Sequence, residues 1–411
     1  MKKKLLITVG AGASVDFGLP SVSHVDSVLD AAAMKLYPLS SDPTSNLYRY
    51  CRDKIQAYYA MAPKPALRRW VNFEEVLYQL NLLAPYYSDP HRIHGSSAAL
   101  VPFPLPDVLE FGRTAKPVDG DVLKALSNNL MDDLVDYFID ACASAAVDKS
   151  IQIDQLRSFL SALRDEFDIG IISLNYDDIF TQVCPDFYTG FNGATGAFEP
   201  LSVLSRSEWN FIYQLHGSIH FAMTGTPLDL NGINWEEMPM KGRAVHAFGR
   251  NTQDSMEGIT YPTSTVVAGY GKTQQILRQP FRTYFAQVNR LIHEADSLLF
   301  IGYGFGDLHL NAAFSEVRDR LRPTVVIDWA NDGQDPLQFR RDAWTYNLFA
   351  TLPTNAHSMS KPGHKTAPSI GELKAENEVE CSNDRNYPLA VWYNGLLAAC
   401  QNLSKIRSHL T

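Results

Sequence analysis

The sequence alternates between short apolar runs and longer segments with apolar residues at helical spacing, and this alternation restricts the fold more than any other feature. The short runs have the length of buried strands. They are residues 4–9, 169–174, 211–215, 265–268, 297–301 and 324–327. Helical spacing occurs between the later runs, at residues 281–294 and 308–321. Because crossover helices bury their apolar stripes on a parallel sheet, we predict an α/β fold with a Rossmann-like parallel sheet that has helices on both faces.

The first half of the sequence contains more helical segments than crossovers alone require. Helical spacing extends over residues 22–36, 46–59, 73–83, 122–146 and 153–167. We therefore predict a helical insertion at about residues 40–165 that forms a second lobe. Residues 84–117 contain prolines and glycines with few periodic apolar positions, which indicates a long loop or insertion.

The end of the sequence has a different character. Residues 353–386 are polar and punctuated by proline and glycine, whereas residues 389–406 have an apolar stripe at helical spacing. We predict one large domain over residues 1–350, followed by a C-terminal linker and helix at residues 351–411. The stripe on that helix either packs into the core or docks a partner.

Composition excludes several classes of protein. Of 411 residues, 45% are apolar and 20% are charged, which is typical of a soluble globular protein. The net charge of −9 offers no basic surface to phosphates, so we predict no direct nucleic-acid binding. The sequence has no run of about 18 apolar residues, and the run at residues 5–9 is too short for a signal peptide. We therefore predict a cytoplasmic protein that does not enter a membrane.

The five cysteines are far apart in the sequence and form no C-x-x-C pair. Such pairs hold structural zinc ions, so the sequence predicts neither a zinc site nor a disulfide framework. We expect each cysteine to be a small core residue.

A glycine-rich turn follows the first predicted strand. It comprises Gly10, Ala11, Gly12, Ala13 and Ser14, with Pro20 shortly after it. Glycines at such a turn let the backbone approach a phosphate, and a following helix supplies unpaired N–H groups. Val15 stands where the dinucleotide-binding pattern has its third glycine, so a tight strand-to-helix turn explains the segment equally well.

Two polar segments follow predicted strands in the middle of the chain. Asn175 and Asp177 come after residues 169–174, and His216 comes after residues 211–215. The carboxyl ends of strands border the ligand crevice of an open α/β sheet, so these side chains are candidates for a pocket. Histidine is the natural proton acceptor near neutral pH. The alternatives are a helix N-cap at the first segment and a structural histidine at the second.

A second glycine-rich turn follows residues 297–301. It contains Gly302, Tyr303, Gly304, Gly306 and Asp307. Two such turns facing each other suit a long nucleotide with two ends, whereas the alternative is a helix that Asp307 caps. Residues 271–273 have the sequence Gly-Lys-Thr, but Val266 stands where a Walker A motif requires glycine, so we predict no ATP site there.

Taken together and in this order, the four segments resemble those of the sirtuin-like family. Residues 10–20 resemble its phosphate-binding turn, and residues 173–177 resemble its asparagine-containing strand end. Residues 215–217 are similar to its histidine motif, and residues 302–307 to its distal nucleotide loop. The resemblance spans about residues 4–330. It implies an NAD⁺-binding catalytic domain.

Departures from the deacetylase pattern indicate the branch that the chain resembles. The deacetylases of the family have a structural zinc on two C-x-x-C pairs, which this sequence lacks. They also have Asp-Phe-Arg at the positions of residues 21–23, which are Ser-Val-Ser here, and glutamine at the position of Leu174. Residues 175–177 and 302–311 look instead like the bacterial anti-phage branch, whose members hydrolyse NAD⁺ to nicotinamide and ADP-ribose. Length and C-terminal addition are most similar to members encoded beside a HerA-type hexameric ATPase.

The resemblance implies roles for individual residues. Asn175 orients a water or a ribose hydroxyl, Asp177 receives the nicotinamide carboxamide, and His216 acts as general base. The remaining nucleotide contacts come from the two glycine-rich turns, Tyr176 and Asp328.

The resemblance also implies a biological setting. It predicts an NAD⁺ hydrolase without a metal, acting in anti-phage defence by NAD depletion, assembled as a homo-oligomer and controlled by that assembly or by a HerA-type ATPase partner. The alternatives are an NAD-dependent protein deacylase and a noncatalytic sensor of NAD⁺ or ADP-ribose.

Overall fold

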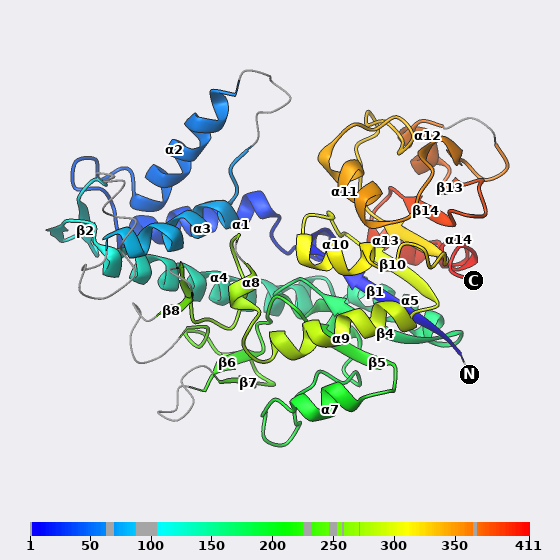
Figure 1. Ribbon diagram of the computed structural model, residues 1–411, viewed down its shortest axis with the longest axis horizontal. Coiled ribbons are helices and arrows are strands. Elements are labelled where there is room, and N and C mark those ends of the chain that lie inside the picture. The colour runs from blue at the N-terminus through cyan, green and yellow to red at the C-terminus, as the bar shows by residue number, and fades with distance from the viewer. Residues whose placement is uncertain are drawn as a thin grey trace.

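An eight-stranded sheet organises the structure (Figure 1). This computed structural model describes residues 2–62, 70–87, 105–224, 232–245, 253–256, 259–270, 272–364 and 368–411. The strands, in their order across the sheet, are β12 (Met359–Ser360), β13 (Glu380–Ser382), β14 (Leu389–Trp392), β11 (Thr324–Ile327), β10 (Ser297–Ile301), β1 (Lys3–Val9), β4 (Phe167–Ser173) and β5 (Asn210–Gln214). Neighbouring strands from β14 to β5 run parallel. Strand β13 pairs antiparallel with both β12 and β14. The prediction of an α/β fold with a mainly parallel sheet is confirmed.

Strand β1 shows why these segments form a sheet that is covered on both sides. Leu5, Ile7 and Val9 belong to one apolar core, and Leu6 belongs to a second core. All four side chains are fully buried. A strand buried on both faces needs a continuous apolar run, which is the pattern that predicts this strand.

Helices cover both faces of the sheet, as the sequence predicts. The helices that contribute to the first core include α5 (Ser150–Arg164), α13 (Leu396–Gln401) and α14 (Leu403–Ser408). Those that contribute to the second core include α9 (Phe281–Glu294), α10 (Leu308–Ser315), α11 (Ala343–Thr351) and α12 (Ile370–Ala375).

A helical lobe is present as predicted, on the left in Figure 1, but its bounds differ from residues 40–165, because α1 belongs to it and α5 packs on the sheet. It consists of α1 (Val22–Leu36), α2 (Leu47–Ala60), α3 (Phe73–Leu83) and α4 (Gly120–Asp148), which pack on one another. The side chains of Asn46, Asn72 and Asp119 cap α2, α3 and α4 by accepting first-turn amide hydrogens. The segment predicted as a loop or insertion contains a hairpin of β2 (Val108–Glu110) and β3 (Thr114–Lys116). Residues 88–104 of that segment lie outside the described residues.

Short elements complete the described chain. They are η1 (Ala11–Ala13), η2 (Val15–Phe17), η4 (Ala84–Tyr87), α6 (Ile179–Val183), α7 (Pro200–Ser205), β6 (Phe221–Met223), β7 (Ile233–Trp235), β8 (Gln253–Met256), β9 (Ile259–Pro262), α8 (Lys272–Gln275) and η7 (Ala356–Ser358). Four of the five cysteines are buried and Cys400 is partly buried, which fits the expected core role. Within the described part of the chain, no helix combines the length and apolarity needed to cross a membrane.

Two predicted elements in the second half differ from the structure. Residues 265–268 do not form a strand of the sheet, and Val266 makes an isolated bridge with Gly217. The run is apolar because it packs against the loop after β5, where the Val267 amide donates to the His216 carbonyl at 2.8 Å. The helix predicted at residues 308–321 ends at Ser315, and the chain continues in turns.

The secondary structure predicted for the C-terminal segment is only partly correct, because residues 396–401 and 403–408 are helical as α13 and α14 but the rest of the segment differs. Residues 389–392 form β14 instead of the start of a helix, and β14 pairs with β11. The segment predicted as a linker contains β12 and β13 of the same sheet. All four side chains of β14 are buried. A short continuous apolar run fits a buried strand as well as a helix, so spacing alone did not distinguish the two.

Candidate functional site

The four sequence motifs follow four adjacent strands. The first glycine-rich turn follows β1, Asn175 follows β4, His216 follows β5, and the second glycine-rich turn follows β10. These strands are neighbours in the order β10-β1-β4-β5. The chain passes from β1 to β4 and β5 on one side and later returns to β10 on the other. Ligands of open α/β sheets bind at such a reversal of strand order, beyond the carboxyl ends of the strands.

The two glycine-rich turns pack directly against each other. The Gly12 amide donates to the Gly302 carbonyl at 3.0 Å. Gly302 has a φ of 58°, and a Cβ atom there would lie 2.0 Å from the Ala13 nitrogen. A Cβ atom on Gly10 would lie 2.6 Å from the Gly302 oxygen. Close approach of two backbones therefore requires glycine in both turns.

The first turn does not lead directly into an α-helix, and the helix predicted at residues 22–36 begins where expected. Two short 3₁₀ helices, η1 and η2, follow it, and α1 begins only at Val22. The amides of Gly12, Ala13 and Ser14 donate to carbonyls of Gly302, Gly10 and Ala11. Because these donors have protein partners, the predicted phosphate contact of this turn stays a prediction.

The orientation of the Asn175 amide is determined by the first turn. Its Nδ2 atom donates to the Gly10 carbonyl and to Ser14 Oγ, both at 3.0 Å. Since a carbonyl oxygen only accepts hydrogen bonds, these contacts establish which end of the amide faces the turn. The residue is 6% exposed, and its buried Oδ1 atom has no hydrogen-bond partner among the described residues. Asn175 therefore presents an unsatisfied acceptor.

Asp177 lies next to this amide and is buried as well. Its Oδ1 atom accepts the Ile179 amide at 3.2 Å, which is a capping contact at the start of α6. Burial raises the pKa of Asp177 to about 6, although contacts with Ser14, Ile179 and Asn175 favour the charged carboxylate.

His216 forms a close pair with Asp307. Its Nε2 atom lies 3.0 Å from Asp307 Oδ2, and both side chains are buried. The contact is short but not well aligned, because neither atom makes a hydrogen bond of standard geometry. Burial lowers the pKa of His216, and Lys272 lowers it further. Burial opposes the charged form of Asp307, but contact with His216 and Lys272 holds the pKa of this carboxyl well below its usual range. Asp307 also accepts the Leu310 amide at 3.1 Å, so the predicted capping role is present too.

Two charged residues that sequence reasoning missed stand behind this pair. Lys272 Nζ lies 3.1 Å from Glu74 Oε1 and 3.6 Å from Asp307 Oδ2. Lys272 belongs to the Gly-Lys-Thr segment that the sequence excludes as an ATP site. Glu74 lies in the helical lobe, and no pattern in the sequence predicts its contact with residues of the sheet.

The predicted catalytic residues line a cavity of about 100 Å³. Asn175, Asp177 and His216 line it together. The other predicted residues on its wall are Ala11, Ser14, Pro20 and Tyr176. The predicted catalytic residues therefore face one cavity, although they come from different strands.

A second cavity, of about 410 Å³, lies on the other side of the first glycine-rich turn. Gly12, Ala13, Gly302 and Asp328 line it, and Trp329 is also on its wall. Burial raises the pKa of Asp328 to about 6. Residues 10–16 thus separate two cavities, with Ala11 and Ser14 on one wall and Gly12 and Ala13 on the other.

Four predicted nucleotide contacts line neither of these cavities, namely Gly10, Tyr303, Gly304 and Asp307. The Tyr303 side chain is buried in the second core, and its hydroxyl donates to Asn311 Oδ1 at 2.6 Å. Gly304 is exposed. The structure therefore gives the Tyr303 ring a packing contact rather than a position at the cavities.

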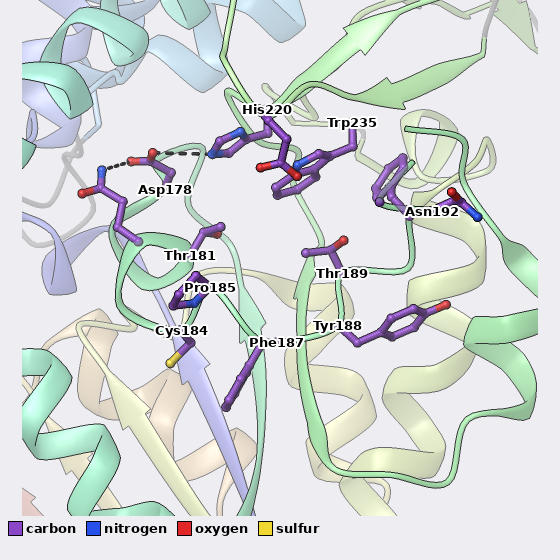
Figure 2. A pocket seen from close by; sticks show the side chains of 14 residues that line it. Asp178, Thr181, Cys184, Pro185, Phe187, Tyr188, Thr189, Asn192, His220 and Trp235 are labelled. Atoms are coloured by element: carbon purple, nitrogen blue, oxygen red, sulfur yellow. Dashed lines mark hydrogen bonds and ion pairs between the residues drawn. The ribbon is translucent and has the colours of Figure 1, made fainter. Parts of the chain in front are cut away.

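A third cavity, of about 440 Å³, lies beyond α6. Figure 2 shows Asp178 and His220 facing each other on its wall, with Trp235 beside His220. His220 Nε2 lies 3.5 Å from Asp178 Oδ2, and the imidazole stacks on the Trp235 ring at a centroid distance of 4.4 Å. Asp177 and Asp178, adjacent in sequence, therefore line different cavities.

Comparison with protein families finds a match over part of the chain. Residues 170–349 match the family model described as SIR2-like domain, which is less than half of the 411 residues. Asn175, His216 and Gly302 lie within the matched segment, whereas the first glycine-rich turn precedes it. No curated protein matches the sequence.

Solved structures include two Sir2 homologues with distant similarity to the chain. A crystal structure described as a Sir2 homolog–NAD complex has 12% sequence identity and a TM-score of 0.36, over 100% of this chain and 91% of that chain. A mutant complex of Sir2 homologues with 2′-O-acetyl ADP ribose has 14% identity and a TM-score of 0.31, over 82% of this chain and 83% of that chain. Both TM-scores are below 0.5, so neither likeness supports a statement about function.

Proposed function

We propose that the chain is an NAD⁺ glycohydrolase, which cleaves the nicotinamide–ribose bond of NAD⁺ with water and releases nicotinamide and ADP-ribose. The observation that carries this proposal is the buried, unsatisfied Oδ1 atom of Asn175, in the same cavity as His216. An acceptor in that position holds a water molecule or a ribose hydroxyl through its hydrogen. The imidazole supplies the proton acceptor that such a hydroxyl needs during attack.

The proposed reaction needs no acid at the leaving group. Nicotinamide in NAD⁺ is cationic, so the electron pair of the C1′–N bond moves to the ring nitrogen and leaves it neutral. The water oxygen bonds to C1′ as the ribose acquires oxocarbenium character, and the proton of that water moves to His216. Asn175 holds the reacting hydroxyl, and Asp177 accepts a hydrogen from the nicotinamide carboxamide.

The two cavities beside the first glycine-rich turn suit the two ends of this substrate. In the proposal, the nicotinamide riboside end occupies the cavity of Asn175, and the pyrophosphate crosses residues 10–14. The adenosine end then occupies the second cavity, where Trp329 offers an aromatic surface and Asp328 an acceptor for ribose hydroxyls.

The test is product analysis by NMR of the purified chain with NAD⁺. We expect nicotinamide and ADP-ribose from the unmodified chain, and a loss of about 10²- to 10⁴-fold in His216→Ala. His293→Ala, which removes an exposed imidazole on α9, serves as the matched control and should keep full activity. Near-unmodified cleavage by His216→Ala would contradict the assignment. Turnover only when an acyl-lysine peptide is added would indicate a deacylase, and binding without turnover would indicate a sensor.

We further propose that the activity serves anti-phage defence in the cytoplasm by depleting NAD. Constant hydrolysis would poison the cell, so the proposal includes control by homo-oligomerisation or by a HerA-type ATPase partner. The family resemblance supports this setting. The same NMR assay, run with and without the ATPase, measures the control directly.

A further inference from the structure

A row of buried and partly buried charges runs from the proposed proton acceptor to the helical lobe. His216 contacts Asp307, Asp307 contacts Lys272, and Lys272 contacts Glu74, at 3.0, 3.6 and 3.1 Å. The exposed fraction of these four side chains is between 5% and 24%. Withdrawing several charges from water costs free energy even when the charges pair. Such a row therefore contributes little to the stability of the fold.

The four residues come from four separate elements. Glu74 lies in the first turn of α3 in the lobe, and Lys272 is the first residue of α8. Asp307 caps α10, and His216 follows β5. The row therefore connects the position of α3 to an imidazole at the edge of the sheet.

The Asp307 carboxylate also favours one of the two tautomers of the neutral imidazole. One of its oxygens accepts the Leu310 amide, and the other lies 3.0 Å from His216 Nε2. Two acceptor atoms repel each other at this distance, so the contact favours the tautomer with the hydrogen on Nε2. The lone pair of the neutral imidazole is then on Nδ1. Asp307 thus orients the base in the way that carboxylates orient catalytic histidines elsewhere.

We propose that Lys272 and Glu74 are positioning residues that act through Asp307 on the His216 imidazole, so that the ion pair between Glu74 of α3 and Lys272 of α8 governs the proton acceptor. This inference rests on the proposed function for its catalytic meaning, but not for its geometry. Lys272 holds the Asp307 carboxylate charged and in place. Glu74 holds Lys272, and it brings a side chain of the helical lobe to the wall of the cavity that His216 lines.

Lys272 and Glu74 shift the pKa of His216 in opposite directions. Burial and Lys272 lower the pKa of His216, whereas Asp307 and Glu74 raise it. Asp177 and Glu74 are the other carboxyl groups that line the cavity of His216. Removing Lys272 should therefore raise the pKa of His216, and removing Glu74 should lower it.

The experiment follows the His216 imidazole by NMR in the full-length protein, with ¹⁵N and ¹H signals measured across pH. We expect the Nε2–H tautomer in the neutral form. Lys272→Met should move the titration to higher pH by about one pH unit, and Glu74→Gln should move it to lower pH. Lys272→Arg keeps the charge and should stay close to the unmodified protein. Lys241→Met, at an exposed lysine paired with Asp140, is the matched control.

Enzyme kinetics provide the second readout. A base must be deprotonated, so kcat/KM for NAD⁺ rises with pH through the pKa of His216, and each variant should shift this rise in the same direction as the NMR titration. If Lys272→Met does not fold, the opposite shift in Glu74→Gln decides the question. Titrations in Lys272→Met and Glu74→Gln that match Lys241→Met would overturn the proposed coupling. Shifted titrations in a protein that never cleaves NAD⁺ would support the coupling and reject the proposed function.

Discussion

Residues adjacent in sequence have different surroundings at the end of β4. Asp177 faces the cavity of Asn175 and His216, whereas Asp178 faces His220 in the third cavity, as Figure 2 shows. The sequence singles out Asp177 because of its position after a strand. Its burial depends on the lobe and the first glycine-rich turn, which the local sequence does not contain.

The first residue-scale prediction concerns the charge of Asp177. Burial raises its pKa from 3.8 to about 6, so the native protein binds this proton more tightly than the unfolded chain. The stability associated with the protonated carboxyl is fully present below about pH 4 and is lost as pH rises through about 6. The loss is on the order of 3 kcal/mol. Asp177→Asn should remove this loss of stability with rising pH, while retaining an acceptor for the Ile179 amide.

Denaturant unfolding at several values between pH 4 and pH 7 measures this effect. The free energy of unfolding of Asp177→Asn should fall less over that interval than that of the unmodified protein. Asp148→Asn, at an exposed carboxyl near the end of α4, should follow the unmodified protein. Identical pH dependence in all three proteins would show that Asp177 is not a buried titrating group.

Residue-scale prediction from sequence succeeded where strand ends bring residues together. Asn175, Asp177 and His216 follow neighbouring parallel strands, so their convergence follows from the strand order. Glu74 and Lys272 could not be found in this way. Their contact depends on how the lobe packs against α8, and neither residue lies in a pattern that a nucleotide requires.

At the scale of elements, the two glycine-rich turns depend on each other. Gly302 adopts a left-handed φ and leaves no room for a Cβ atom beside Ala13. The turns are adjacent because β1 and β10 pair in parallel register, with Val9 opposite Ile301. The site thus depends on backbone packing before any side chain takes part.

Gly302→Ala should therefore destabilise the protein and abolish nucleotide binding. We expect a cost of more than about 2 kcal/mol, because alanine disfavours positive φ and its Cβ atom clashes with backbone. Gly306→Ala is a matched control, since Gly306 has no atom within 4 Å of an added Cβ and no positive φ. Thermal melting and NAD⁺ titration calorimetry measure the two effects. Equal melting temperatures for the two variants would contradict the close packing of the turns.

The accuracy of element prediction varied with how distinctive each pattern was. The helix predicted at residues 22–36 matches α1 at both ends, because its amphipathic period continues over the whole segment. The predicted helix at residues 389–406 begins instead with β14, because four consecutive apolar residues satisfy either structure. The local sequence does not indicate that this run pairs with β11.

At the scale of the whole molecule, the C-terminal segment belongs to the same sheet as the proposed active site. Strand β14 pairs with β11, and Gly395 and Leu396 line the second cavity. The boundary proposed at residue 350 therefore does not separate an accessory linker from the fold. The segment that matches the SIR2-like family model ends at residue 349, before these strands.

Trp392 allows this integration to be tested. Its side chain is fully buried in the first core, and its Nε1 atom donates to the Gly395 carbonyl at 3.0 Å. Trp392→Ala should lower the free energy of unfolding by about 3 to 5 kcal/mol, which is the usual cost of a large cavity. Trp70→Ala removes the same side chain from a position that is 87% exposed and should leave stability within about 0.5 kcal/mol.

Denaturant unfolding followed by far-ultraviolet circular dichroism distinguishes an integrated segment from a separable one. If β14 is part of the sheet, Trp392→Ala moves the whole unfolding transition to lower denaturant, and binding of NAD⁺ weakens with it because Gly395 borders the second cavity. A separable linker and helix would instead lose only a small early part of the signal, with the main transition and the binding unchanged. That second result would show that residues 351–411 fold apart from the sheet.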